Sequence, residues 1–395
     1  MSAPKHQNPF RIHGVVSKPF FTDRANEVER ILKTLAEPAT KLLVYGPRRM
    51  GKTSAIAYAV SRREAAGGVA IMADMSTAST LVDIANRVLE SAGRALGRKW
   101  KDAIGDFVAR IGLSVTLTPD PGTGLIVPSL DVKLRAGSID EQRASLTRTL
   151  DAIDALAKSR KTPIGIVLDE FQEIQRFGGD AAEWHLRGIV QHHRHVSYVF
   201  AGSQAHIIER MLDKGRAFYG LADHLEFGPI DDKHLASWID DRMTNAGVKA
   251  RGVGIVIVGA AGPRTRDIVQ VARQCFDNCR GAGAATGADV TIALGDVVAG
   301  QDAVFHSIWN GLTGAQQNVL RAAAANLEGL TTGVSIKQFG LASSGSASNT
   351  AAAMVEAGHL VKSVAAVGYS FENPFFCRWV LTTTMGDLGA PITKR

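Results

Sequence analysis

The stretch from Gly46 to Ser54, which reads G-P-R-R-M-G-K-T-S, constrains the fold of this 395-residue chain more than any other feature of its sequence. It has the spacing G-x-x-x-x-G-K-[ST] and stands between a short apolar run, Lys41 to Tyr45, and a series of helix formers, Ala55 to Arg63. The two glycines of this spacing, Gly46 and Gly51, let the backbone turn so tightly that its N–H groups point at phosphate oxygens. The pattern therefore predicts a strand, a phosphate-binding loop (P-loop) and a helix, rather than a Gly-rich turn with an incidental lysine.

Each residue type in this loop has an expected role. Lys52 is expected to reach the β- and γ-phosphates of a nucleotide, and the Thr53 hydroxyl to ligate Mg²⁺. The positive amino end of the following helix adds to the attraction for phosphate. The predicted nucleotide-binding residues of the loop are Gly46, Pro47, Arg48, Arg49, Met50, Gly51, Lys52, Thr53 and Ser54.

A second apolar run, Pro163 to Leu168, ends in the acidic pair Asp169-Glu170. A continuous apolar run is typical of a strand buried on both faces, and the carboxyl ends of such strands carry the site in open α/β folds. Asp169 is expected to hold Mg²⁺ through water, and Glu170 to polarise an attacking water as general base. The alternative is an acidic helix cap after an ordinary core strand. Together with the loop, the pair predicts nucleotide hydrolysis.

Strand-like and helical stretches alternate along the first half of the chain, which predicts an α/β fold with a mostly parallel sheet and helices on both faces. The expected strands are 42–45, 69–73, 164–168, 198–201 and 224–227. Apolar and polar residues alternate on both sides of a turn within residues 112–137, which predicts a β-hairpin insertion. We therefore expect a P-loop core at 1–230, a small helical lid at 231–298 and a winged-helix domain at 299–395.

The sequence resembles the archaeal-type ATPases, a P-loop family that borders the STAND and AAA+ ATPases. Besides the two motifs above, the resemblance rests on Asn8-Pro-Phe10, on residues 19–27 (P-F-F-T-D-R-A-N-E) and on residues 373–379 (N-P-F-F-C-R-W). It implies ATP and ADP as the nucleotides, and it implies that Arg24 and Glu27 open a helix beside the adenine. The family usually has Gly where this chain has Asp23, which by its residue type alone predicts a helix N-cap.

The resemblance also extends to sensor residues. The apolar run at 196–202 ends in Ser203 and Gln204 and is similar to the strand whose tip contacts the γ-phosphate or the attacking water in such ATPases. A plain strand-ending turn is the alternative. Arg264 follows Gly-Pro at an expected helix start, where relatives place a residue that faces the nucleotide; Arg266 is a weaker candidate, and a surface arginine is the alternative. The predicted catalytic residues are Lys52, Glu170, Ser203, Gln204 and Arg264.

Two other clusters favour structural interpretations. Residues 192–195 (H-H-R-H) resemble metal ligands, but consecutive side chains at a helix end point in different directions, so we expect a solvated helix end. Arg194 lies where related AAA+ proteins place an arginine finger. Cys275 and Cys279 are one helical turn apart and are expected to pack as small hydrophobic residues.

The net charge of +7 is a weak argument for nucleic acid as a partner. Residues 1–60, which include the phosphate loop, have a net charge of +6, and residues 61–299 have a net charge of zero. A basic patch with an aromatic residue, at 94–101 (R-A-L-G-R-K-W-K), fits a solvated helix face or a contact with a partner or nucleic acid. The expected recognition segment of the winged helix, 346–357, contains no Arg or Lys, which opposes binding to duplex DNA.

Three functions remain open from the sequence. The first is an ATPase that acts as a nucleotide-dependent switch for a protein partner or for self-assembly. The alternative is a DNA-handling AAA+-like ATPase, of the origin-recognition or transposition-regulator type, that loads on duplex DNA. A third is an adaptor that holds ADP without hydrolysis. No apolar run approaches the roughly 18 residues of a membrane span, and residues 1–14 lack the apolar core of a signal peptide. We therefore expect a cytoplasmic protein without a membrane partner.

Overall fold

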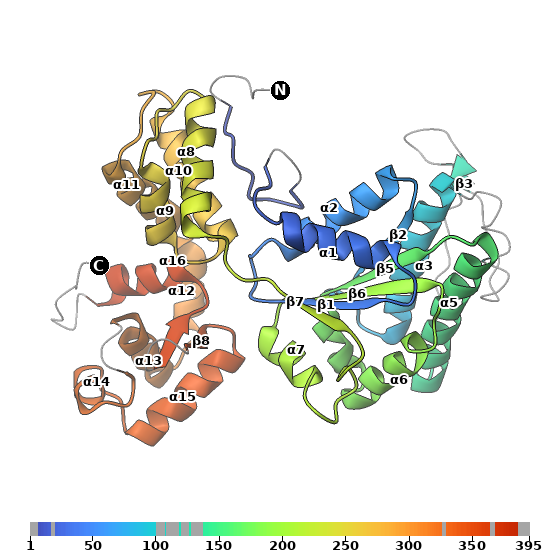
Figure 1. The fold of residues 1–395 in the computed structure, drawn as a ribbon. Coiled ribbons are helices and arrows are strands. Elements are labelled where there is room, and N and C mark those ends of the chain that lie inside the picture. The colour runs from blue at the N-terminus through green and yellow to red at the C-terminus, as the bar shows by residue number, and fades with distance from the viewer. Residues whose placement is uncertain are drawn as a thin grey trace. The chain divides into compact units, whose positions relative to one another are not determined.

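The structure is a computed structural model (Figure 1). It describes residues 7–16, 20–99, 107, 118–119, 126–127, 137–325, 329–363 and 368–385. The chain divides into two compact units, one of His13–Ile230 and the other of Met1–Ile12 with Asp231–Arg395. Among the described residues, no helix combines the length and the apolar composition that crossing a bilayer requires.

A five-stranded sheet forms the centre of the first unit, in the order β2-β5-β6-β1-β7. The strands are β1 (Lys41–Tyr45), β2 (Val69–Asp74), β5 (Ile164–Asp169), β6 (Val196–Gly202) and β7 (Asp223–Glu226). All neighbouring strands run parallel. Every residue of β5 and β6 is buried, as continuous apolar runs predict. The expected α/β fold with a parallel P-loop sheet is confirmed.

Helices cover both faces of this sheet (Figure 1). Leu42 and Val44 point to the face covered by α1 (Ala25–Ala36) and α2 (Lys52–Ala65), and Leu43 points to the opposite core. Successive residues of a strand face opposite sides, so each strand contributes to both cores. The opposite core contains residues of α3 (Leu81–Lys99), α5 (Ile139–Arg160), the 3₁₀ helix η1 (Phe171–Phe177), α6 (Asp180–Val190) and α7 (Ala205–Met211).

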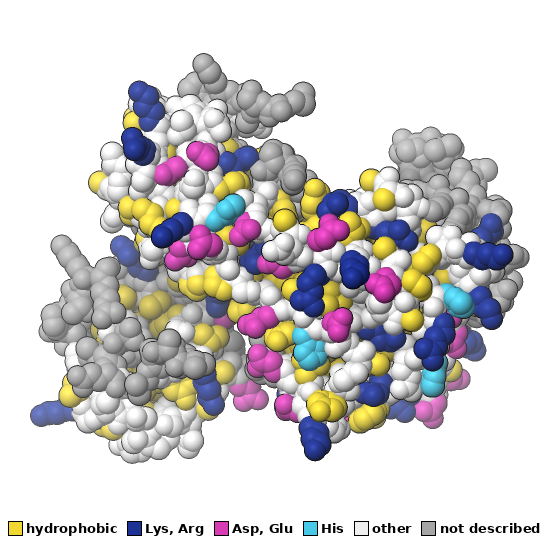
Figure 2. All heavy atoms as spheres, viewed as in Figure 1, with side chains coloured by type: hydrophobic (Ala, Val, Ile, Leu, Met, Phe, Trp, Pro, Cys, Tyr) yellow, Lys and Arg dark blue, Asp and Glu magenta, His cyan; other side chains and the backbone are white. Residues whose placement is uncertain are grey.

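Much of the expected insertion lies outside the described residues. Within it, β3 (Thr118–Pro119) and β4 (Ile126–Val127) form an antiparallel pair, as a hairpin requires. Of the basic patch at 94–101, the structure describes the surroundings of Arg94, which is exposed and donates to Ser91 Oγ at 2.9 Å. Lys, Arg, Asp and Glu side chains are intermixed over the face of the sheet-containing unit seen in Figure 2.

The prediction that Asp23 caps α1 is wrong. The helix begins at Ala25, with Arg24 in the N-cap position, and it has no side-chain capping bond. Asp23 instead adopts a φ of +36°, in the left-handed region that favours glycine. Glycine, which the resemblance implies at this position, adopts such a conformation without strain.

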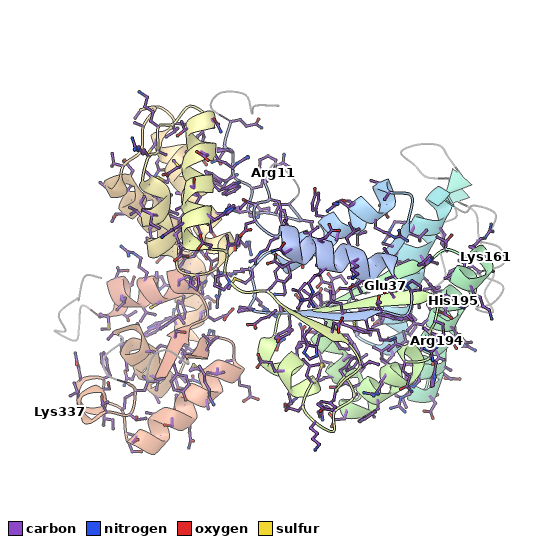
Figure 3. The ribbon with its side chains drawn as sticks, viewed as in Figure 1. Arg11, Glu37, Lys161, Arg194, His195 and Lys337 are labelled. Carbon is purple, nitrogen blue, oxygen red and sulfur yellow. The ribbon has the colours of Figure 1, made fainter. Side chains whose placement is uncertain are left out.

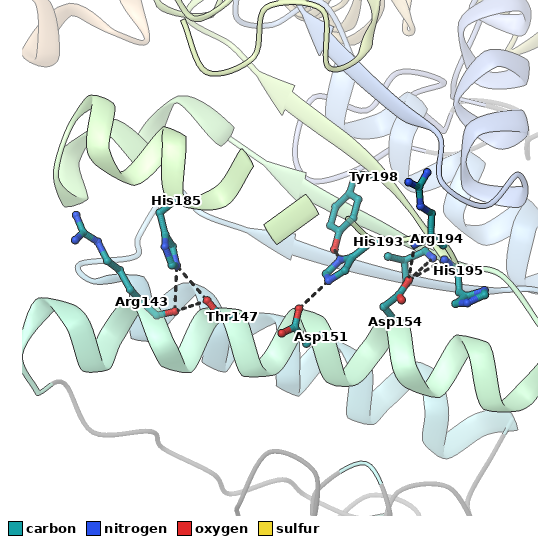
Figure 4. Close-up of polar contacts among 10 residues, drawn as sticks. Arg143, Thr147, Asp151, Asp154, His185, His193, Arg194, His195 and Tyr198 are labelled. Atoms are coloured by element: carbon teal, nitrogen blue, oxygen red, sulfur yellow. Dashed lines mark hydrogen bonds and ion pairs between the residues drawn. The ribbon is translucent and has the colours of Figure 1, made fainter. Parts of the chain in front are cut away.

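The H-H-R-H segment precedes β6, and His193 contradicts the expectation of a solvated helix end. His193 is buried, with Nδ1 2.7 Å from the Tyr198 hydroxyl and Nε2 2.8 Å from Asp151 Oδ1 (Figure 4). The segment folds back on α5, where Asp154 Oδ1 accepts the backbone N–H groups of residues 194–196. Among the described residues, no group of three or more His, Cys, Asp or Glu is arranged to hold a metal ion.

Arg194 and His195 lie at the amino end of β6 (Figure 3). The phosphate loop follows the carboxyl end of β1, the parallel neighbour of β6. Arg194 therefore lies at the amino ends of the parallel strands, whereas the phosphate loop of the same chain lies at their carboxyl ends.

In the second unit, the region expected to form a lid contains four helices. They are α8 (Asp232–Asn245), α9 (Val253–Ala261), α10 (Thr265–Cys279) and α11 (Gly287–Ala299). Cys275 and Cys279 are buried in α10, and burial raises the pKa of Cys275 to about 12, in agreement with a packing role. The N-terminal segment contacts these helices: Asn8 Nδ2 donates to the Arg273 carbonyl at 3.0 Å, and Phe10 contacts Trp238 edge-on.

The region expected to form a winged helix follows. Its helices are α12 (Asp302–Asn310), α13 (Gly314–Ala325), α14 (Gly333–Gln338), α15 (Ser344–Glu356) and α16 (Pro374–Trp379), which continues into a π-helical turn, Val380–Thr384. Between α15 and α16, β8 (Leu360–Ser363) and β9 (Gly368–Phe371) pair antiparallel.

Candidate active site

The backbone of the loop between β1 and α2 depends on its two glycines for different reasons. Gly46 has a φ of +148°, and a Cβ there would lie 2.4 Å from the carbonyl oxygen of Phe227. Gly51 has a φ of +92° with open space around it, and it is the N-cap residue of α2 without a side-chain capping bond. The N–H groups of the first helical turn have no partner within the helix. The loop therefore ends in a group of donors suited to an anion.

Lys52 is buried in this loop with an exposed fraction of 6%. Its Nζ donates to the carbonyl oxygens of Gly46 and Pro47, at 2.8 and 2.7 Å. Burial lowers the pKa of Lys52 to about 8, against the opposing effects of Glu170 and Asp169. A buried ammonium group whose acceptors are neutral carbonyls is suited to binding phosphate oxygens.

Thr53 and Asp169 meet although they are far apart in the sequence. Thr53 Oγ1 donates to Asp169 Oδ2 at 2.9 Å, and the backbone N–H of Glu170 donates to Oδ1 at 3.0 Å. Burial raises the pKa of Asp169 to about 6, and these two hydrogen bonds lower it in part. A hydroxyl and a carboxylate are the oxygen ligands that Mg²⁺ prefers, so this donor set fits the ion. Asp74, the neighbour of Asp169 across β2 and β5, adds negative charge.

Glu170 and Ser203 also come together. Ser203 Oγ donates to Glu170 Oε2 at 2.7 Å, and Arg48 Nε donates to Ser203 Oγ at 3.3 Å. These contacts join the phosphate loop to the carboxyl ends of β5 and β6. Gln204 is the N-cap residue of α7, without a side-chain capping bond.

Gln172 is a site residue that the sequence analysis missed. It is 3% exposed, and its Nε2 donates to Glu170 Oε2 at 2.5 Å. In the sequence Gln172 is followed by Glu173, which is also polar, so residue type alone does not distinguish Gln172 as a site residue. Its position two residues after the acidic pair is the one signal that could have identified it.

Arg24 anchors the loop from outside. Its Nη2 donates to the carbonyl oxygens of Gly228 and Met50, at 2.7 and 3.3 Å, and its Nη1 donates to Glu27 at 2.7 Å. The guanidinium carbon lies 4.8 Å from the centre of the Phe227 ring. These bonds assign Arg24 a role in holding the loop that the resemblance alone did not indicate.

The other predicted residues have more varied surroundings. Ser54 Oγ accepts the backbone N–H of Val16 at 3.2 Å. Arg49 has a φ of +69° and is half-buried, whereas Pro47 and Arg48 are exposed. Arg264 belongs to the second unit, where its Nη2 donates to Glu372 Oε2 at 2.5 Å, and Arg266 is exposed.

Comparisons with known proteins agree with the fold described above. Residues 21–244 match the family described as ATPase domains predominantly from Archaea. The fold is similar to that of the Walker-type ATPase PABY2304 of Pyrococcus abyssi, with a TM-score of 0.59 and 14% identity over 96% of this chain and 98% of that one. It is also similar to the ORC1 protein of Aeropyrum pernix, solved in complex with DNA, with a TM-score of 0.51 and 16% identity over 95% and 96% of the two chains. No curated protein matches the sequence. Identities this low show a common fold alone.

Proposed function

The chain belongs to the family of ATPase domains found predominantly in Archaea, and from this premise we propose that it binds ATP with Mg²⁺ and hydrolyses ATP to ADP and phosphate. The observation that carries the proposal is the meeting of Lys52, Thr53, Asp169, Glu170 and Ser203 around one end of the sheet. This is where open parallel sheets bind their ligands.

Each of these residues has a separate role in the proposed reaction. Lys52 exchanges its two carbonyl acceptors for phosphate oxygens, and the first turn of α2 contributes backbone donors. Thr53 and Asp169 hold Mg²⁺, which neutralises charge on the phosphates when bound. Glu170 accepts a proton from water as the water oxygen attacks the γ-phosphorus and the bond to ADP breaks. Ser203 orients Glu170 through its 2.7 Å hydrogen bond.

We further propose that hydrolysis drives a conformational switch for a protein partner or for self-assembly. A switch needs contacts that differ between the ATP and ADP states, and the γ-phosphate supplies such a difference at Ser203 and Arg48. The segment of the expected winged helix that would read DNA, α15, contains no Arg or Lys. This composition favours a protein partner over duplex DNA, which is usually bound through several cationic side chains.

DNA handling is the second candidate function. The surplus of positive charge and the resemblance of residues 299–395 to a winged helix favour it. In this case ATP would control loading on duplex DNA, and binding would weaken steeply with salt because phosphate contacts release counterions.

Steady-state ATP hydrolysis with and without duplex DNA tests both candidates, with the Lys52→Ala variant as the blank. We expect turnover above the blank that DNA leaves unchanged. Strong stimulation by DNA would favour the second candidate. Turnover equal to the blank, with Mg²⁺ present and ATP bound, would contradict hydrolysis and favour an adaptor that holds nucleotide.

A further inference from the structure

Gln172 is a buried polar residue next to the general base, with no role yet assigned to it. We infer that Gln172 is a positioning residue, which holds the Glu170 carboxylate in the orientation that activates water. The inference rests on the proposed function, because it gives Glu170 the role of base.

The carboxylate of Glu170 is held on one side. Both of its side-chain donors, Gln172 Nε2 at 2.5 Å and Ser203 Oγ at 2.7 Å, contact the same oxygen, Oε2. Among the described residues, none donates a hydrogen bond to Oε1. The arrangement therefore fixes the carboxylate and leaves one oxygen for the proton of a water molecule.

Gln172 is itself fixed at both ends of its amide. Its Oε1 accepts the backbone N–H of Ser203 at 3.3 Å, and a Cβ on Gly202 would lie 2.8 Å from the same oxygen. A carboxylate only accepts and a backbone N–H only donates, so these two partners determine which end of the amide carries the nitrogen. The amide group thus spans from the end of β6 to Glu170 in one orientation.

Glu170 needs such support because of its backbone. It follows β5 directly and has a φ of +54°, in the left-handed region, where the side chain leaves the chain in an unusual direction. Without the hydrogen bonds from Gln172 and Ser203, the Glu170 side chain can adopt other rotamers. Each rotamer that departs from the reactive geometry slows the reaction.

The test is the Gln172→Met variant of the full chain, because methionine matches the length of glutamine and donates no hydrogen bond. We expect kcat to fall about tenfold or more and the KM for ATP to stay within about threefold. Gln175→Met is the matched control: Gln175 lies on the same 3₁₀ helix and donates to a different carboxylate, that of the buried Glu183, at 2.8 Å. The control should keep the wild-type kcat and the wild-type KM for ATP.

Two outcomes would overturn the inference. One is a Gln172→Met enzyme with wild-type kcat; the other is an equal loss of kcat in Gln175→Met, which indicates a merely structural role. If Gln172→Met does not fold, Gln172→Glu replaces it, because it keeps the shape and places a second carboxylate beside Glu170 instead of a donor; the same fall in kcat is expected. Glu170→Gln separates the two proposals: an inactive Glu170→Gln with a normal Gln172→Met overturns this inference alone, whereas a fully active Glu170→Gln overturns the assignment of the base.

Discussion

The Thr53 hydroxyl donates a 2.9 Å hydrogen bond to Asp169 Oδ2, which joins the first turn of α2 to the carboxyl end of β5. The bond holds two expected Mg²⁺ ligands together in the free protein. Asp169 is 4% exposed, and its raised pKa, about 6, shows that ionisation is costly there. A bound cation relieves that cost, which supports the proposed Mg²⁺ site.

Asp169→Asn is expected to stabilise the free protein at neutral pH. The folded-state pKa of Asp169, about 6, lies above the ordinary value of 3.8, so its contribution to stability is fully present below pH 3.8 and is lost as the pH rises through 6. Asparagine carries no charge, and its Oδ1 can accept the backbone N–H of Glu170 while its Nδ2 donates to the Thr53 hydroxyl. Its advantage over wild type in urea unfolding, without nucleotide or Mg²⁺, should grow by about 1–2 kcal/mol between pH 4.5 and pH 8. An advantage that does not change with pH would contradict the burial argument.

ATP affinity is expected to depend on pH through Lys52. Its pKa in the free protein is about 8, and only the protonated ammonium binds phosphate well. Affinity should therefore fall as the pH rises above 8, by up to about tenfold per pH unit. Titration calorimetry at pH 7, 8 and 9 measures this. Lys52→Arg remains charged over the range, so its affinity, whatever its absolute value, should change little; a parallel decline in both proteins would exclude Lys52 as the cause.

The two loop glycines should differ in their tolerance of alanine. Gly51→Ala meets open space and strains only its φ of +92°, which costs about 1 kcal/mol of unfolding free energy. Gly46→Ala adds a collision with the Phe227 carbonyl oxygen, which is backbone, so its cost should exceed that of Gly51→Ala by roughly 1–3 kcal/mol. Urea unfolding of the two variants compares them directly. Equal losses would show that the loop moves away from Phe227 at little cost.

The sequence predicted the sheet well because its strands are apolar runs with polar ends. The motif at Gly46 to Ser54 and the pair Asp169-Glu170 were also expected at one place, and the structure brings them together because the carboxyl ends of parallel strands meet at the same end of the sheet. Features that depend on distant partners were not predictable in the same way. His193 can be buried because Tyr198 and Asp151 form hydrogen bonds with its two ring nitrogens, and contacts with such distant residues leave no local pattern in the sequence.

The same limit applies inside the site. Arg24 binds the carbonyl oxygen of Gly228, about half of the chain away, and Gln172 binds Glu170 only because a 3₁₀ turn brings its side chain back to the end of β5. Asp23 was misassigned because residue type favours a cap, whereas the left-handed backbone is set by the way the chain enters α1.

The most direct test of Glu170 as the general base compares ATP binding and ATP turnover in the Glu170→Gln variant and in wild type. Glutamine keeps the shape of the side chain but cannot take a proton from water. We expect ATP affinity within a few-fold of wild type and a fall in kcat of about 10²–10⁴. Turnover at the wild-type rate, with ATP bound normally, would contradict the role of Glu170 and with it the proposed mechanism.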